Sequence, residues 1–154
     1  MIYIDTSAIV ALIVNEPESA AVTAWYSASR SEIVSAAWCV TEFAGALGMK
    51  QRMCQLDAAQ AQAAWKRFER LAANDLRLLA VEAEDFYRAA MLTLDAASGI
   101  QAADALHLAC AERAGASGLV TLDLLMARNA SQVKLKPVAL EQFSFSRGRS
   151  VSTP

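Results

Sequence analysis

Short runs of β-branched, aromatic and aliphatic residues alternate along the chain with longer segments of helical periodicity, and this alternation restricts the fold more than any other feature. We expect strands at residues 2–4, 33–34, 76–81, 118–121 and 136–140, and helices at residues 8–14, 18–30, from about 37 onward, 57–73, 83–97, 102–114 and 124–130. Strands that alternate with helices are typical of a parallel sheet covered on both faces. The sequence therefore predicts an α/β fold, a three-layer α/β/α sandwich with a central, mostly parallel sheet of four or five strands.

Length and composition fit one domain with a polar extension. The chain has 154 residues, of which 55% are hydrophobic and 19% are charged, and this balance excludes an intrinsically disordered protein. The last residues are rich in Ser and Arg and have no helical or strand pattern. We therefore expect a domain over residues 1–140 and a polar, mobile tail over residues 141–154.

The charge balance limits how the protein could hold a nucleic acid. There are 14 basic and 16 acidic residues, and the formal net charge is −2. A protein that grips nucleic acid by charge alone is usually strongly basic. Any nucleic-acid substrate must therefore be held by local basic residues or through bound metal ions.

The cysteines and the apolar segments indicate a soluble cytoplasmic protein. Cys39, Cys54 and Cys110 are far apart and form no CxxC pair, which predicts buried free thiols in a reducing compartment. The first residues contain no basic leader or signal-peptide segment. The longest apolar stretch, residues 38–49, is interrupted by Glu42 and is too short to span a bilayer, so we expect no membrane association.

Acidic residues occur at positions where an apolar fold should exclude them. Asp5 follows the first predicted strand and Asp123 follows the fourth, and open parallel sheets bind ligands beyond the carboxyl ends of their strands. Glu42 and Asp104 are each the only charged residue in an apolar helical segment. A buried carboxylate is costly unless it is paired or bound to a metal. If those helices begin at the same edge of the sheet, all of these acids converge on one pocket.

Clustered carboxylates with no basic residue among them predict a hard divalent cation. Oxygen ligands suit Mg²⁺ or Mn²⁺, whereas zinc would be expected to bring Cys or His ligands. Such a site can polarise a phosphodiester, activate water and stabilise the leaving oxygen. Thr6, Ser7 and Thr121 lie next to the acids and could orient them through their hydroxyls.

Several short motifs follow one another in a fixed order. They are Ile-Asp-Thr-Ser-Ala at residues 4–8, Thr-Glu at 41–42, Ala-Ala-Asp-Ala-Leu-His-Leu-Ala at 102–109 and Val-Thr-Leu-Asp at 120–123. In order and spacing, this set resembles the PIN-domain family, and most closely the VapC-type toxins of bacterial toxin–antitoxin pairs. The resemblance extends from residue 1 to about residue 140.

The resemblance implies a PIN-like α/β/α nuclease domain that cleaves RNA endonucleolytically with Mg²⁺ or Mn²⁺. The metal-binding and catalytic acids of the family correspond to Asp5, Glu42, Asp104 and Asp123 in this sequence. The resemblance also implies a homodimer and a small antitoxin whose tail occupies the active-site groove. Many relatives have an arginine just before the Ala-Ala-Asp motif, where this chain has Gln101. The alternative is therefore a weakly active or inactive PIN-like module that binds RNA or protein.

Structural roles for the same acids remain open at this point. Asp5 and Asp123 could each simply cap the helix that follows. Glu42 or Asp104 could form a structural ion pair with an arginine such as Arg113 or Arg128. Either outcome would remove a residue from the proposed metal site.

Other interpretations of the motifs are weaker. His107, three residues after Asp104, is interpreted as a hydrogen-bonded core histidine rather than a general base. A haloacid-dehalogenase-type phosphatase also has an Asp after its first strand, but it requires a second Asp where this chain has Ser7. A phosphoacceptor receiver domain requires adjacent acids and a late lysine at a strand end, and neither is evident.

Overall fold

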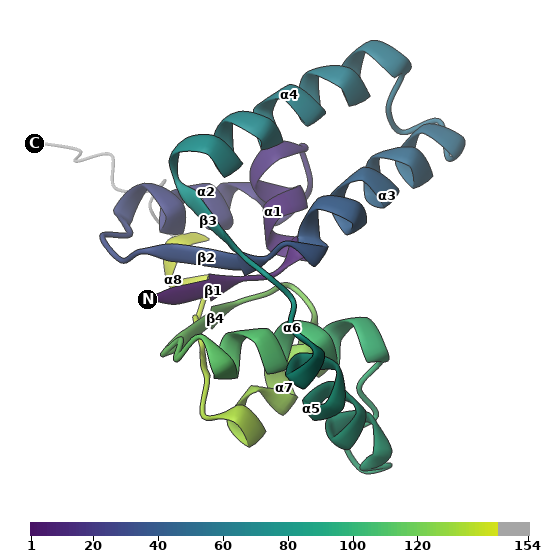
Figure 1. Ribbon diagram of the computed structural model, residues 1–154. Coiled ribbons are helices and arrows are strands. Elements are labelled where there is room, and N and C mark those ends of the chain that lie inside the picture. The colour runs from purple at the N-terminus through teal and green to yellow at the C-terminus, as the bar shows by residue number, and fades with distance from the viewer. Residues whose placement is uncertain (145–154) are drawn as a thin grey trace, which may run out of the picture.

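Five short strands form one parallel sheet at the centre of the molecule (Figure 1). The structure is a computed structural model, and it describes residues 1–144. The strands are β1 (Ile2–Ile4), β2 (Ile33–Ala36), β3 (Leu76–Leu79), β4 (Gly118–Val120) and β5 (Lys136–Pro137). Their order is β3-β2-β1-β4-β5 and every pairing is parallel, which confirms the predicted sheet.

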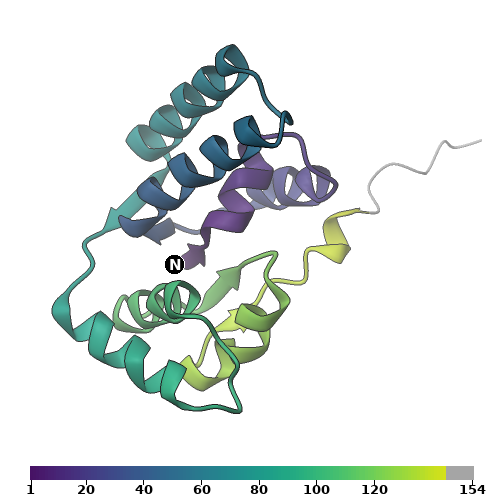
Figure 2. The same ribbon diagram turned by 90° about the vertical axis from the view of Figure 1, so that its right-hand side faces the viewer.

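Helices cover both faces of the sheet. They are α1 (Thr6–Ile13), α2 (Ser19–Ala28), α3 (Trp38–Arg52), α4 (Ala58–Asn74), α5 (Ala83–Leu94), α6 (Ala102–Arg113), α7 (Leu124–Asn129), a 3₁₀ turn η1 (Ala130–Val133) and α8 (Glu141–Ser144). Figures 1 and 2 show α1 to α4 on one side of the sheet and α5 to α7 on the other. This arrangement confirms the α/β/α sandwich.

Two hydrophobic cores lie on opposite faces of the sheet because successive strand residues point in opposite directions. In β1, Tyr3 packs into the core under α5 and α6, and Ile4 packs into the core under α1, α3 and α4. Leu119 and Val120 of β4 divide in the same way. Strands buried on both faces need continuous apolar runs rather than alternating ones, and the sequence has such runs.

The strand order reverses between β1 and β4. The chain moves outward from β1 to β2 and β3, and then returns through α5 and α6 to place β4 on the other side of β1. Such a reversal leaves a crevice at the carboxyl ends of the two strands, which is where open parallel sheets bind ligands. Asp5 follows β1 at this edge, and Asp123 lies just beyond β4.

Several predicted boundaries differ from the structure at the ends of elements. The strand predicted over residues 76–81 ends at Leu79, and the one predicted over residues 136–140 ends at Pro137. The tail predicted for residues 141–154 begins with α8, which packs against α2 through the half-buried Phe143. The rest of the predicted tail, residues 145–154, lies outside the described residues.

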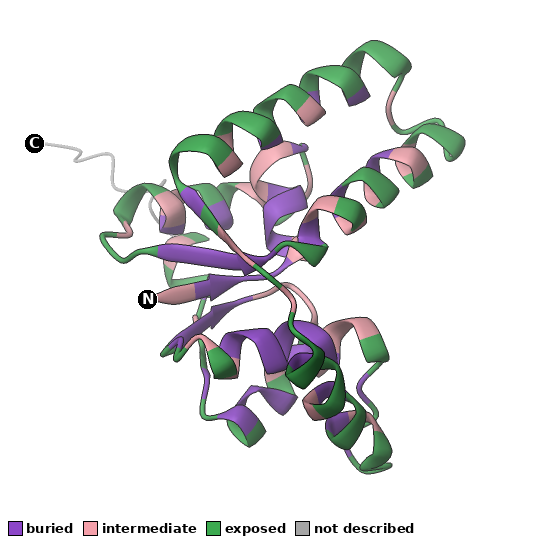
Figure 3. Cartoon of the chain, in the orientation of Figure 1, coloured by how far each residue is buried: buried purple, intermediate pink, exposed green. Residues whose placement is uncertain are grey.

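One cysteine prediction is wrong. All three cysteines are free and Cys39 and Cys110 are buried as predicted, but Cys54 is exposed. Cys54 lies in the turn between α3 and α4, at the tip of the two helices, where Figure 3 shows mostly exposed surface. This tip extends beyond the sheet (Figure 1), and no other element of residues 1–144 covers the thiol. None of the described helices is long and apolar enough to span a membrane.

Candidate active site

Asp5 and Asp123 each cap a helix at the carboxyl edge of the sheet. Asp5 Oδ1 accepts hydrogen bonds from the Ser7 hydroxyl (2.8 Å) and the Ala8 amide (3.2 Å) at the start of α1. Asp123 Oδ1 accepts the Met126 amide at 2.7 Å at the start of α7. The capping role considered for both residues is therefore real. Capping uses only Oδ1 of each carboxylate, so each residue can cap its helix and bind a cation at the same time.

The neighbouring hydroxyls tie these two aspartates to the sheet. Ser7 Oγ donates to Asp5 and accepts the Leu122 amide at 2.9 Å, which joins the end of β1 to the loop after β4. Thr121 Oγ1 accepts the Asp123 amide at 3.0 Å. These contacts fix the backbone around both acids before any ligand binds.

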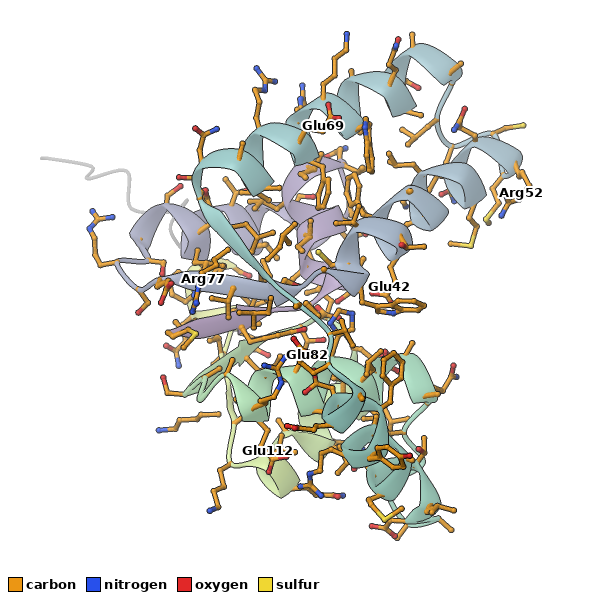
Figure 4. All side chains as sticks on the ribbon, in the orientation of Figure 1. Glu42, Arg52, Glu69, Arg77, Glu82 and Glu112 are labelled. Carbon is orange, nitrogen blue, oxygen red and sulfur yellow. The ribbon has the colours of Figure 1, made fainter. Side chains whose placement is uncertain are left out.

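Glu42 lies on α3 near the sheet and is held by two residues from other elements. Its Oε2 accepts a hydrogen bond from Thr6 Oγ1 at 2.5 Å and lies 2.5 Å from His107 Nε2. Figure 4 shows Glu42 at the end of α3 nearest the sheet, with Arg52 at the distant end. The basic residues of α3 are therefore remote from this carboxylate.

Arg113 does form a structural ion pair, but its partner is Asp85 and not Glu42 or Asp104. Arg113 binds Asp85, with Nε 2.7 Å from Oδ1 and one terminal nitrogen 2.9 Å from Oδ2. Within residues 1–144, no lysine or arginine forms a salt bridge with Glu42 or Asp104. The one salt-bridge contact of these acids within residues 1–144 joins Glu42 to His107, so an arginine partner does not explain either of them.

Asp104, in the first turn of α6, shows that the acids lie close together. Its pKa is raised to about 6, first by burial and then by the negative charges of Asp123, Asp5 and Glu42, although His107 opposes the shift. Carboxylates raise the pKa of one another only when they share a small region of space. Acids at the start of α1, on α3, on α6 and in the loop after β4 thus lie near enough to interact electrostatically.

Local surroundings adjust the other acids in different directions. Burial raises the pKa of Asp5, although His107, Ser7 and Ala8 partly offset it. Burial also acts on Glu42, but hydrogen bonding and charge from His107, together with Thr6, hold its pKa below the usual value. The surroundings of Glu42 therefore favour its charged form, whereas those of Asp5 and Asp104 disfavour it.

The donor set suits a hard divalent cation. Within residues 1–144, no group of three or more His, Cys, Asp or Glu side chains is already arranged to hold a metal ion. The acids are nevertheless all-oxygen donors, and Asp123, Asp5 and Glu42 each contribute to raising the pKa of Asp104. Carboxylates of this kind favour Mg²⁺ or Mn²⁺ over zinc. Asp5, Glu42, Asp104 and Asp123 are the residues that would hold it.

The sequence did not identify every residue that contributes to the site. His107 is buried and hydrogen-bonded, which confirms the core interpretation, but its contact with Glu42 also makes it part of the acid cluster. Tyr3, which contacts His107 Nδ1 at 2.7 Å, was hidden within an ordinary apolar strand. Gln101 stands at the N-terminus of α6, where its exposed side chain makes no capping hydrogen bond.

The chain is similar to a known protein family and to several solved structures. Residues 2–131 match the PIN domain. Similar solved structures include FitAcB from Neisseria gonorrhoeae, with a TM-score of 0.70 and 18% identity, covering 92% of this chain and 99% of that chain. VapC20 from Mycobacterium tuberculosis, a sarcin–ricin loop cleaving toxin, has a TM-score of 0.67 and 19% identity, covering 89% of this chain and 100% of that chain.

VapBC2 from Rickettsia felis, bound to a DNA fragment from its promoter, is also similar in structure. Its TM-score is 0.62 at 18% identity, covering 90% of this chain and 98% of that chain. The TM-scores show that the chain shares its fold with these three structures, at identities of only 18% and 19%. No curated protein matches the sequence.

Proposed function

Because this chain belongs to the PIN-domain family, whose members are generally nucleases that depend on divalent metal ions, we propose that it is a Mg²⁺- or Mn²⁺-dependent endoribonuclease. The reaction is hydrolysis of RNA phosphodiester bonds. The residues that hold the cation and support catalysis are Asp5, Glu42, Asp104 and Asp123, with Thr6, Ser7 and Thr121 in supporting positions.

One observation supports this proposal: acids from four separate segments of the chain interact at the crevice where the strand order reverses, and within residues 1–144 none of them forms a salt bridge with a lysine or arginine. Elsewhere in the same molecule, the buried Asp85 has an arginine as its partner. A fold that neutralises an ordinary buried acid but leaves this cluster negative has retained an unfavourable arrangement. Such an arrangement is expected where function requires charge rather than stability.

The residues of the chain fix the site before substrate arrives. Asp5 and Asp123 are set by the helices they cap, and Glu42 is set by Thr6 and His107. When bound, Mg²⁺ or Mn²⁺ acts as a Lewis acid toward the phosphodiester and lowers the pKa of water. The formal net charge of −2 also makes a bound cation the natural link between this acidic edge and an RNA phosphate.

We further propose that the protein is the toxin of a toxin–antitoxin pair and that a small antitoxin blocks the site. The similar structures include VapC20, a toxin, and the VapBC2 and FitAcB assemblies. A groove of about 710 Å³ lies between the start of α2 and the start of α7, and both Thr121 and Asp123 line it. A peptide segment bound there would cover one acid directly. Co-purification with the product of the adjacent reading frame, and loss of cleavage in that complex, tests this proposal.

The nuclease proposal is tested with a mixed-sequence RNA and purified protein in Mg²⁺, in Mn²⁺ or in EDTA. We expect cleavage that EDTA abolishes and that Asp5→Asn lowers by more than about 100-fold, since even changes around a metal ligand typically cost 10–100-fold. Asparagine can still cap α1, so the variant should remain folded. Glu69→Gln, an exposed acid on α4, is the matched control and should cleave normally.

Two results would count against the nuclease. Cleavage by Asp5→Asn at the wild-type rate would discard the mechanism and point to a contaminating enzyme. RNA binding without cleavage by the wild-type protein would favour the inactive binding module that Gln101 suggests.

A further inference from the structure

A chain of buried hydrogen bonds leads from the sheet to Glu42. The Ala36 amide of β2 donates to Tyr3 Oη at 2.9 Å, and Tyr3 Oη lies 2.7 Å from His107 Nδ1. On the other side of the ring, His107 Nε2 lies 2.5 Å from Glu42 Oε2. Both Tyr3 and His107 are almost completely buried, with 0% and 2% of their surface exposed. The network therefore connects the core to one acid of the cluster and to no other ligand.

One assignment of donors and acceptors gives every group in this chain of hydrogen bonds a partner. Tyr3 Oη accepts the Ala36 amide, so its hydroxyl hydrogen is available to donate to His107 Nδ1. Burial raises the pKa of Tyr3 well above its usual value, so the phenol stays protonated. A histidine that accepts at Nδ1 carries its proton at Nε2, and Nε2 then donates to Glu42.

This arrangement holds Glu42 by hydrogen bonds from two other elements. In the Nε2–H form, the imidazole donates to the carboxylate and leaves Nδ1 to accept from Tyr3. Thr6 Oγ1 donates to the same oxygen, Oε2, so that both donors act on one side of the carboxylate. The other carboxylate oxygen of Glu42, Oε1, takes part in neither of these two contacts. His107 is too buried to meet an RNA substrate, so any effect it has on the reaction passes through Glu42.

We propose that His107, held in its Nε2–H form by Tyr3, is a positioning residue that fixes the Glu42 side chain for cation binding. The inference rests on the proposed function, because the cation is the one that the nuclease requires. It adds a buried residue pair, Tyr3 and His107, to the residues on which the site depends.

The protonated nitrogen of the ring can be observed directly, because the chain contains a single histidine. The ¹⁵N spectrum of the metal-free protein labelled at histidine therefore reports His107 alone. We expect the Nε2–H form in the wild type and a mixture of both neutral forms in Tyr3→Phe, which removes only the hydroxyl. A wild-type spectrum of the Nδ1–H form, or no change in Tyr3→Phe, would overturn the proposal.

Binding of Mn²⁺ alone, measured by electron paramagnetic resonance without RNA, tests the consequence for the site. We expect His107→Leu to weaken binding by about 10–100-fold, the usual effect of losing a group that orients a ligand. His107→Gln keeps an N–H donor near the Nε2 position and should recover most of this affinity. Val133→Ala, in the core near the opposite edge of the sheet, is the control for general destabilisation and should bind normally.

The outcomes separate this inference from the proposed function. If the wild type binds Mn²⁺ and Glu42→Gln does not, but His107→Leu binds normally, the positioning role alone is overturned. If the wild type binds no Mn²⁺, the nuclease proposal fails and the positioning role fails with it. If His107→Leu does not fold, Tyr3→Phe replaces it in the binding measurement, and normal affinity in that variant overturns the proposal.

Discussion

Two aspartates in equivalent positions show how surroundings decide what an acid does. Asp85 and Asp104 are each the third residue of a helix, in α5 and α6, and these helices pack against each other. Arg113 holds the pKa of Asp85 below its usual range despite the opposing effect of burial. Burial and three neighbouring acids raise the pKa of Asp104 to about 6. The surroundings of Asp85 thus favour its charged form, whereas those of Asp104 disfavour it.

Replacing Asp104 by asparagine should stabilise the metal-free protein. In EDTA at neutral pH, the free energy of unfolding should rise by about 1–2 kcal/mol, because an uncompensated charge is removed and solvent screening limits the gain. Urea denaturation measures the change. Added Mg²⁺ should stabilise the wild type more than the variant, since the variant lacks one of the proposed ligands.

The same residue should give a pH dependence of definite sign. A carboxyl whose folded pKa is raised to about 6 retains its proton in the folded state after the unfolded chain has released it. Wild-type stability should therefore fall as the pH rises from about 4 to about 6. The difference in the free energy of unfolding between Asp104→Asn and the wild type should vanish near pH 4. Glu84→Gln, an exposed acid on α5, should change neither quantity, and an equal gain in that control would refute the explanation.

Some residues of the site could be predicted from the sequence, and others could not. Glu42 and Asp104 were predictable because a charge in an apolar helix requires an explanation. Tyr3 and His107 were not predictable as partners of Glu42, because a tyrosine in a strand and a histidine in a helix fit an ordinary core. Their contact joins residues 104 positions apart, and no local pattern carries such information.

At the scale of elements, one buried ion pair fastens α5 to α6. Arg113, at the end of α6, contacts both oxygens of Asp85, which is 1% exposed, and also donates to the Ala80 carbonyl just before α5. Asp85 in turn accepts the Glu82 amide and completes the capping of α5. A single carboxylate therefore sets both the start of one helix and the end of its neighbour.

Asp85→Asn should lower the free energy of unfolding by about 2–3 kcal/mol at neutral pH, because Arg113 loses its partner. A lowered folded pKa gives stability that is present above the unfolded value and is lost as the pH falls through the folded value. Acid should therefore remove this contribution from the wild type below about pH 4, and the variant should depend less on pH there. Glu112→Gln, which breaks the exposed bridge to Arg88, should cost less than about 1 kcal/mol. Equal losses of stability in the two variants would contradict the stabilising role of the ion pair between Asp85 and Arg113.

The type and order of the elements were predictable, but several ends were not. The strand predicted to continue to residue 81 ends at Leu79, where the chain leaves the sheet to reach α5. The helix predicted to continue to residue 97 ends at Leu94, although Ala96 and Ala97 would suit a helix. Tertiary contacts rather than local propensity decide such ends.

At the scale of the whole molecule, an apolar face remains uncovered. Along α5, the side chains of Phe86, Tyr87, Met91 and Leu94 are 56%, 77%, 55% and 74% exposed. Trp38 and Phe86 border an apolar hollow of about 470 Å³ beside this face. Exposed apolar surface of this extent is typical of a protein–protein contact.

We predict that the protein is a homodimer and that this face of α5 forms the contact. Sedimentation velocity at micromolar concentration should show a dimer for the wild type and a monomer for Tyr87→Glu. Leu124→Glu, at an exposed residue of α7, is the control and should remain dimeric. A wild type that sediments only as a monomer would contradict the prediction, and a dimeric Tyr87→Glu would assign the contact to another face.

The exposed turn between α3 and α4 provides a site for selective labelling of the protein. Cys39 and Cys110 are buried, and burial raises the pKa of their thiols to about 11 and about 12, so a maleimide dye should modify Cys54 alone. A fluorophore at that tip would leave the acidic edge untouched. The natural sequence can therefore be labelled without mutation to follow the encounter with RNA or antitoxin in real time.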